Sequence, residues 1–234
     1  MKNLNASAIH LNEQVQSDLD ESSPDLSGLQ IGSALQLQIG AIGYIVTLIG
    51  YLKGQGLMVT TPLEHENPTQ PEEGQAVVVR FFNDRRAHAF NSTIQQVVNK
   101  PFPYLQLAYP EETHELRERQ HDRIKINITG NADSLDGKSF SCVVQDISMG
   151  GALIAVNDLD GSVNDKLVLT LHVVVNDIEY NLSLDSEIRS VRIETSSGGS
   201  LPSVMQGLSF SNLSKEEILA LAALELLPDW DSTA

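Results

Sequence analysis

Residues 119–156, RQHDRIKINITGNADSLDGKSFSCVVQDISMGGALIAV, contain the pattern that decides the fold. Ile124-Lys-Ile-Asn-Ile128 alternates apolar and polar residues, which is the period of a strand with one buried face. Two apolar runs follow, at residues 140–147 and 152–156, and the small polar segment 148–151 separates them. The stretch therefore predicts three β-strands, the last two joined by a tight turn.

The rest of the second half continues this pattern. Asn176-Asp177 is a two-residue hairpin signal between two apolar runs. Further strands are expected at residues 167–175, 178–184, 187–194 and 205–210. Together with the strands described above, they predict a small antiparallel barrel.

A helix is expected to close this barrel. Ser214-Lys-Glu-Glu217 reads as a capping box, in which each of the two end residues satisfies a backbone N–H at the start of a helix. The helical period predicts that one side of this helix is buried. The residues assigned to that side are Ile218, Leu219, Ala222 and Leu226.

The first half also reads as short strands with regular breaks. The expected strands are residues 35–39, 45–49, 56–60, 76–82 and 92–98. Turn formers such as Lys53-Gly-Gln-Gly56 separate them, and few stretches have a helical period. Such a pattern favours a barrel or a sandwich. The expected fold class is therefore mainly β, with two β-barrel domains and a C-terminal helix.

Changes in composition along the chain suggest the domain boundaries. Residues 1–27 are polar and are expected to form a mobile lead-in. We expect an N-terminal β-domain at 28–110 and a charged interdomain arm at 111–123. The C-terminal barrel and its helix then occupy 124–234.

The composition argues against several classes of partner. The chain of 234 residues has 31 acidic and 15 basic residues, which gives a formal net charge of −16. Repulsion at this charge argues against nucleic-acid polymers and anionic membranes, so an anionic ligand must be bound by a local cluster of Lys and Arg. The most apolar segment, residues 39–52, is shorter than the ~20 residues of a membrane-spanning helix.

Cysteine content and the N-terminal sequence point to a reducing compartment. Cys142 is the one cysteine, it lies in an apolar run, and we expect a buried structural thiol. No basic segment followed by an apolar one opens the chain, so no signal peptide is expected. Both features favour a cytoplasmic protein.

Two short segments hold the residues with chemical character. Segment 117–125 carries four of the 15 basic residues, and segment 146–151 reads DISMGG. Taken alone, the first is a solvated linker whose charges pair with neighbouring glutamates, and the second is an ordinary turn. Taken together, the two segments are typical of a ligand-binding site, for the reason that follows.

The pair resembles the signature of the PilZ family, in which Arg-x-x-x-Arg is followed along the chain by Asp/Asn-x-Ser-x-x-Gly. The five specified positions are filled here by Arg119, Arg123, Asp146, Ser148 and Gly151. Gln206-Gly-Leu-Ser-Phe210 also resembles the Gly-x-x-Phe strand of that family. The family's barrel agrees with the strands expected above.

The resemblance implies that the chain binds cyclic di-GMP and needs no cofactor. Arginine can direct two donors at guanine O6 and N7 or at phosphate oxygens, and Asp146 can accept from guanine N1–H and N2–H. Ser148 can add a hydroxyl contact, while Gly151 would allow close backbone approach or a positive φ. Gln120 and Gly150, which lie inside the motifs, complete the expected ligand-binding set. Glu118 stands where many relatives have a basic residue, which leaves the number of bound ligands open.

The first half resembles the N-terminal domain of flagellar brake (YcgR-like) PilZ proteins. The stretches that carry this resemblance are residues 48–51, 57–62, 74–82 and 90–105. It implies a split-barrel-like domain that contacts a protein partner, with components of the flagellar motor as one candidate. It also implies a location at the flagellar basal body as one option, and a homodimer is a further candidate assembly.

This resemblance suggests a switch, and two other readings stay open. A charged arm between two barrels should become ordered over the ligand and reset the arrangement of the two halves. One alternative is a ligand-independent interaction or adaptor protein on the same scaffold. The other is a flavin-binding enzyme, although no nucleophile–base pair, phosphate loop or metal-ligand spacing is evident, and we expect neither an enzyme nor a metal site.

Overall fold

The computed structural model describes residues 24, 26, 28–62, 70–83, 86–116, 121–159, 161–175, 177–194 and 203–226. The chain divides into two compact units, which are described separately. The first contains Met1–Leu35, Val46–Thr61 and Pro71–Leu116, and the second contains Gln36–Ile45, Pro62–Gln70 and Arg117–Ala234. The predicted lead-in at 1–27 lies almost entirely outside the described residues.

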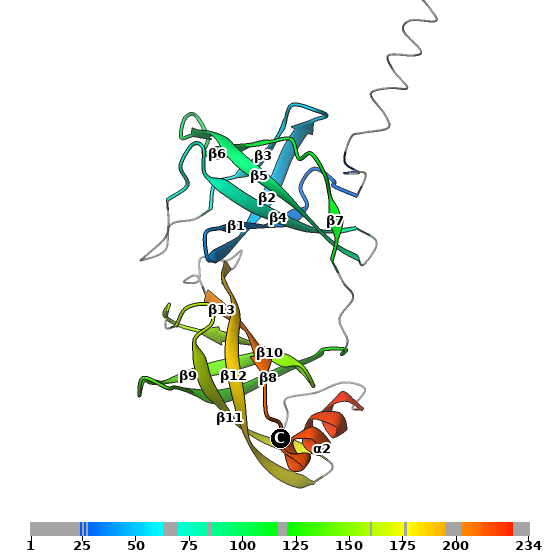
Figure 1. Ribbon diagram of the computed structural model, residues 1–234, viewed down its shortest axis with the longest axis vertical. Helices are drawn as coiled ribbons and strands as arrows, with labels where there is room; N and C mark the ends of the chain where they lie inside the picture. The colour runs from blue at the N-terminus through cyan, green and yellow to red at the C-terminus, as the bar shows by residue number, and fades with distance from the viewer. Residues whose placement is uncertain are drawn as a thin grey trace, which may run out of the picture. The chain divides into compact units, whose positions relative to one another are not determined.

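Strand pairing closes a barrel in the first half (Figure 1). Its strands are β1 (Ala34–Ile39), β2 (Ile42–Leu52), β3 (Gly56–Thr60), β4 (Ala76–Asn83), β5 (Arg86–Val98) and β6 (Tyr104–Ala108), and a short β7 (His114–Glu115) pairs with β5. They are neighbours in the order β1-β4-β5-β6-β3-β2, and β2 pairs back to β1. Leu37, Leu48 and Ile94 are fully buried, as the period of two requires.

One strand of this barrel was missed by the sequence reasoning. β6 follows Pro101 and Pro103, beyond residue 98, where the last strand expected in the first half ends. Leu105 and Leu107 alternate with polar residues and are fully buried, and the strand pairs with both β3 and β5. Both prolines precede the first residue of β6, so neither has to donate an N–H group to the sheet. They therefore do not prevent a strand that is paired on both sides.

The second half forms an antiparallel barrel of six strands. These are β8 (Ile124–Ser134), β9 (Ser139–Ser148), β10 (Gly151–Val156), β11 (Lys166–Val175), β12 (Ile178–Glu194) and β13 (Ser203–Phe210). The order β8-β9-β10-β13-β12-β11 closes when β11 pairs with β8. Its core includes Val144, Ile154, Leu169 and Leu184, all fully buried. The expected mainly β fold with two barrels and a C-terminal helix is thus confirmed.

The helix α2 (Lys215–Glu225) begins as the sequence predicts but buries a different side. Ser214 accepts from the N–H of Glu217, and Glu217 accepts from the N–H of Ser214, so the capping box is present. The buried residues are Ala220, Leu221 and Leu224. The predicted face of Ile218, Leu219, Ala222 and Leu226 was wrong, with Leu219 66% and Leu226 84% exposed. The helix carries its own apolar residues on several sides, so the helical period alone does not show which side is buried.

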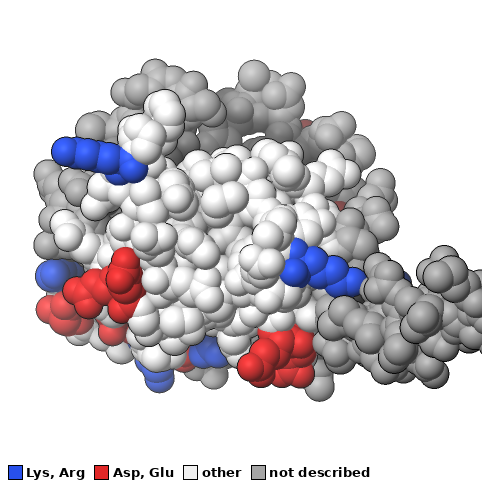
Figure 2. Space-filling model, turned by 90° about the horizontal axis from the view of Figure 1, so that it is seen from above, with Lys and Arg blue, Asp and Glu red and all other residues white. Residues whose placement is uncertain are grey.

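The first barrel has strands without charge, although the chain as a whole is strongly acidic. β1, β2, β3 and β6 contain no Lys, Arg, Asp or Glu. On β2 and β3, Ile45, Ile49 and Met58 are each about 40% exposed. Figure 2 shows a broad face of uncharged residues with the charged side chains gathered near its margin. Such a face can approach another protein without removing charges from water.

No helix in the described part of the chain is long and apolar enough to cross a bilayer.

Cys142 should be protected from thiol reagents in the native protein. Its side chain is 2% exposed, and burial raises the pKa of the thiol to about 11. Because the thiolate is the reactive form, iodoacetamide at pH 8 should label native protein at least ~10-fold more slowly than urea-unfolded protein. Mass spectrometry of timed samples measures both rates. Equal rates would show that the thiol is not enclosed in the barrel.

Candidate functional site

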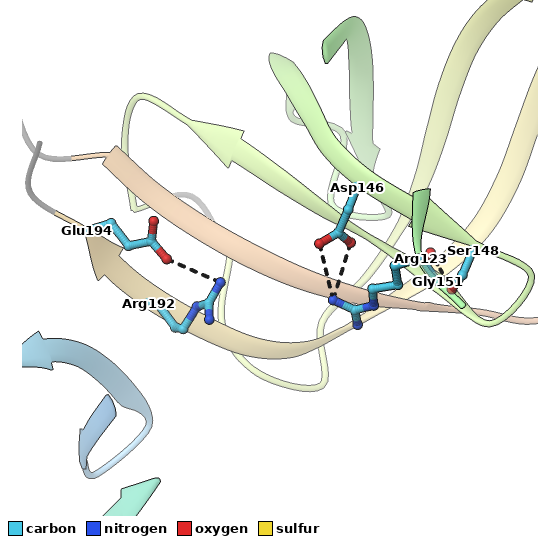
Figure 3. Close-up of polar contacts among 6 residues, drawn as sticks. All are labelled: Arg123, Asp146, Ser148, Gly151, Arg192 and Glu194. Atoms are coloured by element: carbon cyan, nitrogen blue, oxygen red, sulfur yellow. Dashed lines mark hydrogen bonds and ion pairs between the residues drawn. The ribbon is translucent and has the colours of Figure 1, made fainter. Parts of the chain in front are cut away.

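An ion pair joins the two predicted motif elements. Arg123 immediately precedes β8 and Asp146 lies near the end of β9. The Arg123 Nη1 atom lies 3.2 Å from Oδ1 and 3.4 Å from Oδ2 of Asp146 (Figure 3). The antiparallel pairing of β8 with β9 causes this meeting, because it sets Lys125 opposite Asp146. Two residues 23 positions apart therefore face one another.

Asp146 keeps unused capacity to accept hydrogen bonds. Its side chain is 19% exposed, and that of Arg123 is 30% exposed. Oδ1 is buried and lies within ion-pair distance of Arg123, but it accepts no hydrogen bond of good geometry; Oδ2 accepts one. A carboxylate can accept about four hydrogen bonds, and a guanidinium has five N–H donors. Both groups can therefore bind a further polar partner at this place.

The segment after Asp146 is a tight turn held from several sides. Ser148 is 5% exposed, and its hydroxyl donates to the carbonyl oxygen of Gly151 at 3.3 Å. The N–H of Phe210 on β13 donates to the carbonyl oxygen of Gly150 at 3.1 Å. In this structure the hydroxyl of Ser148 therefore stabilises the turn. The motif serine fixes the backbone that carries Asp146.

Gly151 is required by close packing. Its backbone does not have a positive φ, so that part of the sequence expectation was wrong. A Cβ placed there would lie 2.0 Å from the carbonyl oxygen of Leu208 on β13. At Gly150 a Cβ would meet only Cδ2 of His121, at 3.5 Å, which is an ordinary contact. His121, inside the first motif, thus lies beside the turn of the second motif.

Arg119 and Gln120 lie outside the described residues, together with Arg117 and Glu118. Of the seven predicted site residues, the structure describes Arg123, Asp146, Ser148, Gly150 and Gly151. All five lie at the junction of β8, β9 and β10.

Two further polar contacts of the second barrel were not anticipated. The N–H of Met149 donates to Oε1 of Glu225, the last residue of α2, at 2.9 Å. On β12, Arg192 is paired with Glu194 at 3.2 Å, and its side chain is 24% exposed (Figure 3). The sequence holds one indication that Glu225 makes a contact: it lies at the C-terminus of a helix, where an acidic residue is disfavoured.

A cavity lies at another place in the second barrel. The cavity, about 420 Å³, is lined by residues that include Lys166, Asp185, Glu187 and Ser209, and it contains neither Arg123 nor Asp146. Within the described ranges, no group of three or more His, Cys, Asp or Glu side chains could hold a metal ion.

Each half of the chain matches the model of a known protein family. Residues 30–110 match the family model for the flagellar protein YcgR (PilZNR), and residues 117–225 match the model for the PilZ domain. No curated protein matches the sequence.

Similar solved structures include the Bacillus subtilis inhibitor of motility MotI/DgrA, which is 16% identical to this chain with a TM-score of 0.46. The match covers 85% of this chain and 96% of MotI/DgrA. Escherichia coli YcgR in complex with c-di-GMP is 14% identical, with a TM-score of 0.47 and coverage of 91% and 86%. The K. pneumonia MrkH–c-di-GMP complex is 14% identical, with a TM-score of 0.47 and 93% coverage of both chains.

The two glycines of the turn should respond differently to substitution. Gly151→Ala should lower the free energy of unfolding by roughly 1–3 kcal/mol, because the new methyl group collides with the backbone of β13. Gly150→Ala should change it by less than about 1 kcal/mol, because its methyl group meets only the edge of His121. Urea unfolding of both variants measures this difference. Equal midpoints for Gly151→Ala and the wild type would contradict the packing explanation.

Proposed function

We propose that this chain, which belongs to the PilZ-domain proteins with a YcgR-type N-terminal domain, binds cyclic di-GMP and regulates a protein partner in response. The observation that carries this proposal is the Arg123–Asp146 pair, which lies beside the turn 148–151 and keeps unused hydrogen-bonding groups. Both family models and the solved complexes of relatives with c-di-GMP agree with it.

The chemistry of the pair fits guanine. Guanine presents N1–H and N2–H on one edge, and a partly buried carboxylate such as Asp146 can accept from both. Adenine lacks this pair of donors, so Asp146 would select against it. Arg123 can donate to guanine O6 and N7 or to a phosphate oxygen, and its planar group does so with two donors. Asp146 is therefore assigned to specificity and Arg123 to attraction of the anion.

The remaining motif residues would complete the site. Arg119 precedes Arg123 by four positions, a length of chain that can span at most about 14 Å. His121, which lies inside the first motif, is beside Gly150, so a described residue of that motif lies next to the turn. In our proposal Arg119 binds the second phosphate or guanine and Gln120 adds a polar contact. A cluster of arginines offsets the repulsion that a chain of charge −16 exerts on an anion.

The output would pass through protein contacts. Binding fixes residues 111–125 over the ligand and thereby changes the arrangement of the two halves. The exposed apolar residues on β2 and β3, on strands without charge, support contact with another protein through the first barrel. A component of the flagellar motor and a second copy of the chain are the candidate partners, and the cytoplasm, including the flagellar basal body, is the proposed location.

A ligand-independent adaptor is the second candidate function. The observation that favours it is that Arg123 and Asp146 pair with each other, as a structural ion pair on a barrel surface does. In that case the pair would add up to about 1 kcal/mol of stability and have no ligand. Direct titration separates the two candidates.

Calorimetric titration of the full chain with cyclic di-GMP should show binding that depends on the pair. Arg123→Ala and Asp146→Ala should each weaken binding by about 10- to 150-fold, because each removes a charge-assisted contact worth roughly 1.5–3 kcal/mol. Lys138→Ala is the control, since it removes an exposed basic residue from the turn between β8 and β9, at the opposite end of the same strand pair. It should bind like the wild type. Absence of binding by the wild type would favour the adaptor, and unchanged affinity in both site variants would remove them from the site.

Saturating cyclic di-GMP should also slow hydrogen exchange across residues 111–125 and change the small-angle scattering curve, because the arm closes over the ligand. Mass spectrometry of peptides from this segment measures the first effect, with peptides from β3 and β4, which do not pair with β7, as the internal control. If exchange and scattering both stay unchanged while the ligand is bound, the ligand does not act through the interdomain arrangement.

A further inference from the structure

Glu225 connects the C-terminal helix to the turn of the proposed ligand site. It is the last residue of α2, and its Oε1 atom accepts a hydrogen bond from the backbone N–H of Met149 at 2.9 Å. Met149 lies between Ser148 and Gly150. The contact spans 76 positions in the sequence, so the fold of the second barrel creates it.

The helix itself gives no reason for a glutamate at this position. The C-terminal end of a helix carries partial negative charge, which disfavours a carboxylate, and the last turn of α2 has no basic residue. Glu216 and Glu217 lie in the first turn, where the same dipole favours them. Glu225 therefore has an unfavourable local position, and its hydrogen bond to Met149 is the compensating contact.

The contact completes the set of bonds that hold the turn. The hydroxyl of Ser148 spans the turn to Gly151, and the N–H of Phe210 fixes Gly150 to β13. Glu225 holds the amide between these two points. A charged acceptor makes this bond stronger than one between neutral groups. The backbone that follows Asp146 is thus bonded to its own strand pair, to β13 and to α2.

We propose that Glu225 is a positioning residue for the ligand site, and that α2 is coupled to ligand binding through it. This inference rests on the proposed binding of cyclic di-GMP at Arg123 and Asp146. Glu225 is assigned no contact with the ligand, because its carboxylate already accepts from the backbone N–H of Met149. It acts by keeping the Ser148–Gly151 turn in the conformation that presents the carboxylate of Asp146. By linkage, bound ligand in turn stabilises the end of α2.

Three variants of the full chain test this inference. Glu225→Ala removes the acceptor, whereas Glu225→Gln keeps an oxygen that can accept from Met149. Glu216→Ala is the control, because it removes an exposed glutamate at the other end of the same helix. In calorimetric titration with cyclic di-GMP, Glu225→Ala should bind about 5- to 30-fold more weakly. Glu225→Gln should stay within about 3-fold of the wild type, and Glu216→Ala should match it.

Hydrogen exchange of the ligand-free protein gives a second, independent measurement. The Met149 amide should exchange at least ~10-fold faster in Glu225→Ala, because it loses its acceptor, and at nearly the wild-type rate in Glu216→Ala. Wild-type affinity in Glu225→Ala, or equal loss of affinity in Glu225→Ala and Glu225→Gln, would overturn the inference. If the wild type does not bind cyclic di-GMP, the proposed function fails, and unchanged exchange at Met149 would overturn the positioning role separately.

Discussion

The ion pair between Arg123 and Asp146 is the interaction on which the proposed site depends. Arg123 stands at the entry to β8 and Asp146 near the exit of β9, and the antiparallel register of the two strands sets them together. The register of β8 against β9 shifts between Lys125 and Ile128, just after Arg123. The first residues of β8 are therefore offset from the rest of the strand. The barrel therefore brings a basic arm and an acidic turn to one place. Strand pairing thus brings the two charged groups together, and the turn 148–151 holds the backbone that follows Asp146.

The second constraint is the close packing beneath the turn. β10 starts at Gly151, where the carbonyl oxygen of Leu208 leaves no room for a side chain. Gly130 on β8 shows the same effect, because a Cβ there would lie 2.5 Å from Leu171 and 2.9 Å from the carbonyl oxygen of Thr170. Gly130 and Gly151 thus mark places where neighbouring strands approach each other closely. The motif glycine belongs to the framework that presents Asp146, and the buried hydroxyl of Ser148 belongs to it as well.

Much of this fold could be predicted from the sequence, because inward residues alternate along most strands. The strand at 56–60 and the Asn176-Asp177 hairpin were both predicted, and Asp177 has a φ of 63°, as such a turn requires. β12 was predicted as two strands because Asp185 and Ser186 interrupt the apolar pattern. Ser186 continues the buried face, since its hydroxyl donates to the carbonyl oxygen of Leu184 on the same strand.

The site was only partly predictable. Arg123, Asp146 and Gly151 were predicted from the resemblance of the two motifs to the PilZ signature, and the structure places all three at the junction of β8, β9 and β10. Glu225 could not be assigned, because its partner is a backbone N–H that sequence patterns do not reveal. The buried side of α2 could not be assigned either, because it depends on how the helix meets the barrel. Periodicity resolves one element at a time, whereas these contacts join elements far apart in the chain.

The most direct measurement of the central claim is a crystal structure of the full chain grown with cyclic di-GMP. Our account predicts a guanine edge within hydrogen-bonding distance of the Asp146 carboxylate, with Arg123 bonded to the same ligand through guanine or phosphate. A ligand bound elsewhere, with the Arg123–Asp146 pair unchanged and exposed to water, would contradict it.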